Sequence, residues 1–214
     1  MEKPLYDSNN KLGVMSYLIS SGFFATLLGS YIVLIFISTN ESLRNESILT
    51  SITSFIGLLI SVFGLYNGLK KRAIHSFLVT GLLLALLTLN GLFRNIIPAL
   101  SDASASLSPW GIAAVTCFSV LFINGVIALL LPRKHLFVRK MMLILSMTIL
   151  VAIDGITFVS DVISLVQTGA AKGQIALLSL LSAYTNLAPI VILGFLIGYL
   201  LDVHFKNEVV EKKD

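Results

Sequence analysis

The chain has 214 residues, of which 56% are hydrophobic and 12% are charged, and its mean hydropathy is +0.93. Soluble domains carry roughly a quarter charged residues, so this composition excludes a water-soluble globular protein. The net charge is +4 and the chain has one cysteine, Cys117, which excludes an intrachain disulfide and a metal site built from several cysteines. The composition predicts an all-α polytopic membrane protein.

Long apolar runs follow one another along the chain, separated by short linkers. A run of about 20 apolar residues is enough to cross a bilayer as a helix. Six transmembrane helices are predicted, over Leu12–Ser38, Ile48–Leu69, Ala73–Leu100, Trp110–Leu131, Met141–Val166 and Ile175–Leu201. We therefore expect a polar lead over residues 1–11, a six-helix bundle over residues 12–201 and a charged tail over residues 202–214.

The basic residues are spread unevenly over the two ends of this predicted bundle. Twelve of the fifteen lysines and arginines fall at one end, only Arg44 and Lys172 at the other, and Arg94 lies inside the third run. Cytoplasmic loops of membrane proteins carry the excess of lysine and arginine. This predicts that both termini are cytoplasmic, in a cell membrane that we take to be a bacterial plasma membrane. The positive charge then needs no nucleic-acid partner.

Two stretches carry a resemblance to a known kind of protein. "KLGVMSYLIS" and "FIGLLISVFGLYNGLKKRAIHSFLVTGLLLALL" contain glycine-spaced apolar helices, and a tight basic turn lies between two of them. In this respect residues 11–90 resemble small bacterial membrane proteins of the DUF4190-like family, which has no assigned chemistry. The six runs and cytoplasmic termini are also similar, in architecture alone, to the substrate-capture subunits of energy-coupling-factor transporters. That similarity implies that small residues of the first run dock a shared membrane partner.

Small residues four apart allow two helices to approach closely in lipid. Such ridges occur at Ser21, Ala25 and Gly29, with Gly22, Thr26 and Ser30 beside them, at Gly64 and Gly68, at Gly81 and Ala85, and at Gly194 and Gly198. We expect these ridges to hold the bundle together. The alternative is that the broad double ridge of the first run docks a partner protein.

Charged residues also occur inside the runs. The stretch "AIDGITFVSD" places Asp154 and Asp161 seven residues apart, on nearly the same face of the fifth helix. Arg94 of the third run matches the depth of Asp161, which predicts a structural ion pair between them. Pro98 is expected to end the third run, because proline removes a backbone donor and clashes with the preceding turn.

Asp154 lies deeper and has no cation at its own depth. Asn124, Tyr184 and Asn186 are the polar residues expected at that depth, and Pro189 is expected to bend the sixth helix. If these residues face inward, they line a polar binding pocket that opens outward. One interpretation is a protonated Asp154 that is bonded to an amide and only structural. The other is a proton- or ligand-binding site, since charged residues at membrane depth are commonly functional.

The patterns required for catalysis are missing from the sequence. An intramembrane aspartyl protease needs two carboxylates from different helices, whereas Asp154 and Asp161 share one. His75, His135 and His204 each fall near a membrane boundary without a second ligand nearby, so we expect no metal and no cofactor.

Two hypotheses for function follow. The first is a non-enzymatic integral membrane protein that acts through contacts with a membrane-protein partner or with itself, as an accessory, regulatory or immunity-type subunit. The alternative is a small-solute transporter or substrate-capture subunit that binds a small molecule in a polar pocket around Asp154. A bound small molecule would distinguish the second from the first.

Overall fold

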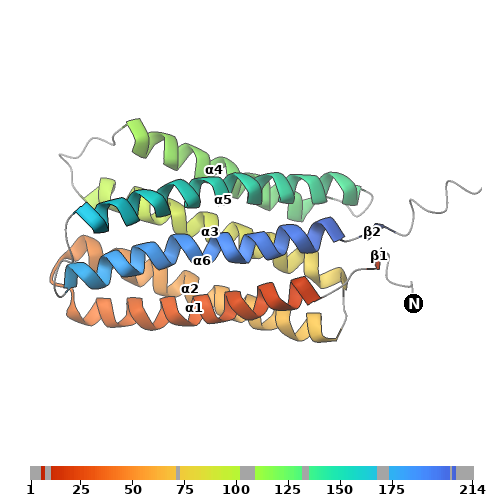
Figure 1. Cartoon of the computed structure of the whole chain (residues 1–214), viewed down its shortest axis with the longest axis horizontal. Coiled ribbons are helices and arrows are strands. Elements are labelled where there is room, and N and C mark those ends of the chain that lie inside the picture. The colour runs from red at the N-terminus through yellow and green to blue at the C-terminus, as the bar shows by residue number, and fades with distance from the viewer. Residues whose placement is uncertain are drawn as a thin grey trace, which may run out of the picture.

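The computed structural model describes residues 6–7, 11–70, 73–101, 109–131, 135–167, 174–202 and 204–205. Six long helices make up nearly all of this: α1 (Lys11–Ile37), α2 (Glu41–Leu69), α3 (Ala73–Ser101), α4 (Pro109–Leu130), α5 (Leu136–Gln167) and α6 (Gln174–Asp202). Two short strands, β1 (Tyr6–Asp7) and β2 (His204–Phe205), pair in antiparallel fashion. Both strands lie at the same end of the bundle (Figure 1).

The helices form a closed ring. Each helix packs against the next one in chain order, and α6 also packs against α1. The axes run along the length of the bundle (Figure 1). In this ring α2 lies opposite α5, and α3 lies opposite α6. Side chains from opposite sides can therefore face one another across the interior.

The structure confirms an all-helical chain and changes the start of two helices. α2 begins at Glu41 instead of Ile48. The backbone N–H of Leu43 donates to the side-chain oxygen of Asn40 at 3.3 Å, so Asn40 caps the helix. The first turn is polar, and a search for apolar runs does not detect it. Most of the predicted linker between the first two runs, residues 39–47, is therefore helix.

α5 likewise begins at Leu136, before the predicted start at Met141. Arg139 lies in this added segment, and its Nη2 donates to the carbonyl of Leu129 at 3.3 Å. A cation is favourable at the C-terminal end of a helix such as α4. The expectation that Pro98 ends the third helix was wrong, because α3 continues to Ser101. Proline weakens a helix within a bundle but need not end it there.

Five helices are long and apolar enough to cross a membrane, over Lys11–Ile37, Leu43–Leu69, Ile112–Leu130, Phe137–Ser160 and Ala183–Asp202. In α3 the described side chains include an apolar stretch over Phe77–Phe93. Large apolar side chains cover the outside of the bundle; Phe36 is 83% exposed and Ile156 is 75% exposed. Exposed apolar surface of this kind marks contact with a membrane or a partner. The architecture is that of a multi-pass membrane protein.

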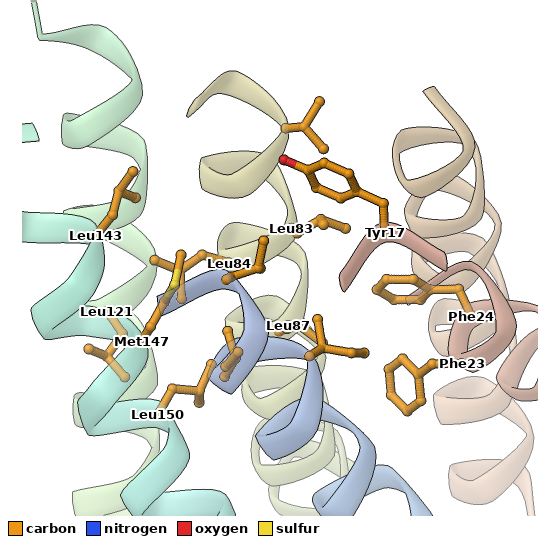
Figure 2. Close-up of a cluster of buried hydrophobic side chains, with 14 of the residues drawn as sticks. Tyr17, Phe23, Phe24, Leu83, Leu84, Leu87, Leu121, Leu143, Met147 and Leu150 are labelled. Atoms are coloured by element: carbon orange, nitrogen blue, oxygen red, sulfur yellow. The ribbon is translucent and has the colours of Figure 1, made fainter. Parts of the chain in front are cut away.

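A cluster of buried apolar side chains fills the interior. Figure 2 shows Leu83 and Leu84 of α3 between Tyr17 and Phe24 of α1 on one side and Met147 of α5 on the other. All five are fully buried. Through this cluster, helices on opposite sides of the ring pack against one another. Further members of the cluster also border the cavity described below.

Glycine residues of α2 lie in close contact with the neighbouring helices. A Cβ added at Gly57 would lie 2.6 Å from the ring of Phe24, and one added at Gly64 would lie 2.7 Å from Val79. Next to them the hydroxyl of Ser20 donates to that of Ser61 at 2.7 Å. Gly64 therefore packs inside the bundle, on one row with Gly57 and Ser61. Gly68 is also buried, and Gly198 lies against Leu12.

The double ridge of α1 does not pack within the bundle. Ala25 and Gly29 are exposed, Ser21 is half-buried, and a Cβ added at Gly22 or Gly29 would meet nothing within 4 Å. Gly194 of α6 is also exposed, and a Cβ added there would meet nothing within 4 Å. The expectation that the α1 ridge and Gly194 hold the bundle together is therefore corrected. The inward face of α1 comprises Gly13, Ser16, Tyr17, Ser20, Phe23, Phe24, Leu27, Tyr31 and Leu34. Because α1 is apolar all round, its sequence does not indicate which face turns inward.

Candidate functional site: a polar cavity inside the bundle

All six helices line an interior cavity of about 260 Å³. For comparison, an apolar cavity of about 150 Å³ is large enough to bind benzene. The polar residues of its wall are Thr50, Asn90, Asp154, Thr157, Thr185 and Asn186. Apolar side chains, among them Phe23, Leu27 and Phe118, form the rest. The cavity can hold a ring-sized molecule that also carries a polar group.

The cavity lies deep in the bundle. Thr50 is nine residues from the start of α2, and Asp154 is thirteen residues from the end of α5. At 1.5 Å per residue these positions are roughly 14–20 Å from the helix ends that lie away from β1 and β2. A bilayer core spans about 30 Å, so polar groups at this depth have little access to bulk water.

On the α5 side the wall carries a carboxylate. Asp154 is 8% exposed, and Thr157 follows it by one turn on the same face. The Thr157 hydroxyl donates to the carbonyl of Ile153 at 2.5 Å, so its proton is used within the helix. Asp154 of α5 takes part in further interactions, and so does Asn186 of α6. This side of the cavity therefore contains a buried carboxyl group.

On the α2–α3 side the wall contains an amide and a hydroxyl group. The Thr53 hydroxyl donates to Oδ1 of Asn90 at 2.6 Å, which leaves the Nδ2 group as the donor end of that amide. Asn90 lines the cavity and is 9% exposed. Thr50 also lines it and is 2% exposed, and its hydroxyl has no hydrogen-bond partner in the described part of the chain. An unpaired buried hydroxyl costs about 1–3 kcal/mol, so its presence calls for an explanation.

α6 contributes a helix irregularity next to the cavity. Pro189 lies inside the helix and lines the cavity together with Thr185 and Asn186. Proline has no N–H with which to close the helix hydrogen bond to the carbonyl of Thr185. In membrane helices such interruptions are tolerated where neighbouring polar groups or a cavity are at hand. The two buried polar residues and the proline thus lie together at one place on the wall.

Of the four binding residues expected from the sequence, Asp154 and Asn186 line the cavity. Tyr184 packs its ring against that of Phe23, with the ring centroids 5.5 Å apart, and so stands behind a residue of the wall. Asn124 lies elsewhere. Its Nδ2 donates to the hydroxyl of Ser146 at 2.7 Å and links α4 to α5.

The predicted ion pair between Arg94 and Asp161 lies outside the described residues as far as the side chains are concerned. Their backbone positions fall in α3 and α5, respectively. The pair therefore stays a prediction.

Sequence reasoning missed four residues of the wall as binding candidates, namely Thr50, Asn90, Thr157 and Thr185. A signal was present in the spacing, because Thr157 follows Asp154 by three residues and Thr53 follows Thr50 by three. Polar residues three apart share a helix face. Matching such pairs by depth on several helices would have found the polar wall.

The polar groups of this wall can form hydrogen bonds with a bound molecule. One carboxylate lies among hydroxyl and amide groups, and no cluster of three or more His, Cys, Asp or Glu that could hold a metal occurs among the described residues. No family model matches the chain, and no match was found among curated proteins or solved structures. The geometry of the cavity is therefore the basis for assigning a function.

Proposed function

We propose that the protein binds a small organic molecule in this cavity and acts as a small-solute carrier or a substrate-capture subunit in a membrane. One observation carries the proposal: polar side chains from four helices surround a cavity of about 260 Å³ deep within an apolar bundle. Polar groups at membrane depth are expensive and usually functional. The cavity also combines apolar walls with a few polar groups, as ligand sites do.

The proposed setting is a bacterial plasma membrane, with six spans and both termini in the cytoplasm. The pairing of β1 with β2 supports an even number of crossings, because it brings the two ends of the chain together. The excess of basic residues at that same end supports the cytoplasmic side.

Filling the cavity tests the proposed function. Ala114 of α4 lines the cavity, whereas its neighbour Ala113 is exposed on the outer face. Ala114→Phe places a ring in the binding space, and Ala113→Phe adds the same ring outside it. A thermal-unfolding screen of the purified full chain against small ring compounds with polar groups should give shifts for the parent and for Ala113→Phe. Ala114→Phe should lose them. Equal shifts in both variants would place binding outside the cavity.

A second candidate function is contact with a partner helix through the outer face of α1. The supporting observation is that Gly22, Ala25 and Gly29 are exposed and that nothing lies within 4 Å of a Cβ added at either glycine. Small residues there would allow close approach of another helix in lipid. Gly29→Leu should then reduce the size of the complex measured by light scattering in detergent, while Gly194→Leu serves as a control on α6. An unchanged complex would remove this candidate.

A further inference from the structure

The cavity is closed on most of its sides and open on one. Its lining residues from α1, α2 and α6 are all buried, whereas four from α3, α4 and α5 are partly or largely exposed: Gly91, Ala114, Ile153 and Thr157. Gly91 does not open the wall, because the ring of Phe118 packs directly against it and fills the contact of α3 with α4. The opening therefore lies on the side of α4 and α5.

The inward face of α5 loses its cover along the helix. Leu150, Asp154 and Thr157 follow one another at spacings of four and three residues, so they share one face. Leu150 is 1% exposed and Asp154 is 8% exposed, but Thr157, which also lines the cavity, is exposed. Figure 1 shows that α4 and α5 lie close together near the end that carries β1 and β2 and diverge toward the other end. The divergence of α4 from α5 accounts for the exposure of Thr157.

A hydrogen bond joins the two helices on one side of this opening. It runs from Nδ2 of Asn124 on α4 to the hydroxyl of Ser146 on α5. Ala114 lies ten residues before Asn124, and Thr157 lies eleven residues after Ser146. Since α4 and α5 run in opposite directions, both positions are about 15–17 Å from the bond, toward the same end of the bundle. Ala114 and Thr157 therefore lie at matching levels on the two helices that flank the opening.

The surface beside the opening is apolar. Ala114 lies four residues and Thr157 nine residues from the nearer end of its own apolar run, which is about 6–14 Å of helix. On the outer surface at these levels Ile112 is 53% exposed and Ile156 is 75% exposed. Apolar side chains exposed at this depth of a membrane helix contact lipid chains. In a bilayer the opening would therefore face hydrocarbon.

On the premise of the proposed function, we propose that the cavity takes its ligand sideways from the bilayer, through the opening between α4 and α5. The ligand is then a small lipid-soluble molecule with an apolar body and one uncharged polar group. Its apolar body concentrates it in the hydrocarbon that the opening faces. The polar group suits the few polar side chains of an otherwise apolar wall. A charged compound would have to leave water for hydrocarbon before it reached the opening, which is strongly unfavourable.

A spin label identifies what the opening faces. Thr157→Cys carries a nitroxide, in a Cys117→Ala background, on the full chain in lipid nanodiscs. Oxygen concentrates in lipid and a nickel chelate stays in water, so their collision rates with the label report its surroundings. The label should meet oxygen and not nickel, as should one on Leu145→Cys, which is 59% exposed on the outside of α5. A label on the exposed helix end, Glu41→Cys, should show the reverse. A label on Thr157→Cys that meets nickel, or meets neither reagent, would overturn the proposal.

Closing the opening tests the route. Ala113→Cys and Ile156→Cys place thiols on the outer surface beside it, since both residues are exposed and neither lines the cavity. A short linker that dithiothreitol cleaves joins them. Exchange of bound para-fluorobenzyl alcohol, followed by fluorine NMR, should slow several-fold on linking and recover on cleavage. Ile123→Cys with Leu145→Cys is the matched control, because these exposed residues adjoin the existing bond between α4 and α5. Equal exchange in both linked proteins would overturn the proposal.

A charged probe tests the class of ligand. Para-fluorobenzenesulfonate has the same ring as para-fluorobenzyl alcohol but a permanent charge, and it should not bind. Binding of the sulfonate as tightly as the alcohol would overturn the assignment of a lipid-soluble, uncharged ligand.

Ala114→Phe distinguishes the failure of this inference from the failure of the proposed function. If it abolishes binding of the alcohol, but linking the helices leaves exchange unchanged, the cavity is a ligand site reached by another route, and only this inference fails. If the parent does not bind the alcohol or any related ring compound, or Ala114→Phe binds them equally well, both proposals fail.

Discussion

The hydroxyl of Thr53 on α2 donates a hydrogen bond of 2.6 Å to Oδ1 of Asn90 on α3. This bond links two neighbouring helices at the wall of the cavity and sets the orientation of the Asn90 amide. It therefore joins α2 to α3 and fixes the orientation of a residue that lines the cavity.

Thr53→Val should weaken the contact between α2 and α3. Hydrogen bonds between helices in a bilayer are worth about 0.6 kcal/mol on average and up to about 1.7 kcal/mol, so the free energy of unfolding should fall by that amount. Equilibrium unfolding in mixed micelles measures it. Thr148→Val is the control, because the Thr148 hydroxyl is exposed and bonds only to the carbonyl of Ile144 in its own helix. Identical losses for both variants would show that the bond between α2 and α3 adds nothing.

Thr50→Val should stabilise the protein without ligand. It removes a buried hydroxyl that has no partner in the described residues, and such a group costs about 1–3 kcal/mol. Thr88→Val should show no such gain, because the equally buried Thr88 hydroxyl bonds to carbonyls of its own helix. Unfolding titrations of the two variants make the comparison. A loss of stability in Thr50→Val as large as in Thr88→Val would contradict the assignment of Thr50 as an unsatisfied group.

Gly57→Ala should destabilise the bundle. The added methyl group would lie 2.6 Å from the ring of Phe24, which is fully buried. Overpacking of this kind costs about 1–3 kcal/mol. Gly22→Ala meets nothing within 4 Å and should be neutral or slightly stabilising. The difference is measured as the shift in the midpoint of thermal unfolding, and equal midpoints would argue against the close contact of α1 with α2.

Asn124 and Ser146 should behave as a structural pair. A double-mutant cycle with Asn124→Leu and Ser146→Ala should give a coupling energy near 0.6 kcal/mol and at most about 1.7 kcal/mol. Because Asn124 does not line the cavity, the binding of small ring compounds should stay within error of the parent. Zero coupling together with lost binding would instead support the binding role that the sequence predicted for Asn124.

Cysteine labelling tests the proposed orientation. In a Cys117→Ala background, Lys70→Cys should react with an impermeant reagent only after the cell is opened. Glu41→Cys should react from outside in intact cells. Both positions are exposed, at opposite ends of α2. The reverse pattern would place the termini outside.

The sequence predicted the lengths of the helices well, but it did not predict which face of a helix turns inward. Apolar runs gave four helices within two residues, since a span needs a fixed length of apolar chain. They could not give the polar first turn of α2, which depends on the cap at Asn40. Nor could they show that Ala25 and Gly29 face outward, because a helix that is apolar all round has no distinctive face.

The candidate site was only partly predictable for a similar reason. Asp154 and Asn186 were singled out because carboxylates and amides are rare in such runs. Thr50 was not, since threonine in a helix ordinarily bonds to its own backbone, as Thr53 and Thr88 do here. Only the packing of α2 against its neighbours reveals that the buried hydroxyl of Thr50 lacks a partner among the described residues and that Thr50 lines a cavity.

The claim that the cavity is a ligand site is tested most directly by native mass spectrometry of the full chain released from mild detergent. The parent and Ala113→Phe should each carry a small molecule, taken up from the cell or from an added ring compound with a polar group, that dissociates on activation. Ala114→Phe should carry none. A bound mass that persists in Ala114→Phe, or a parent that binds nothing under either condition, would contradict the claim.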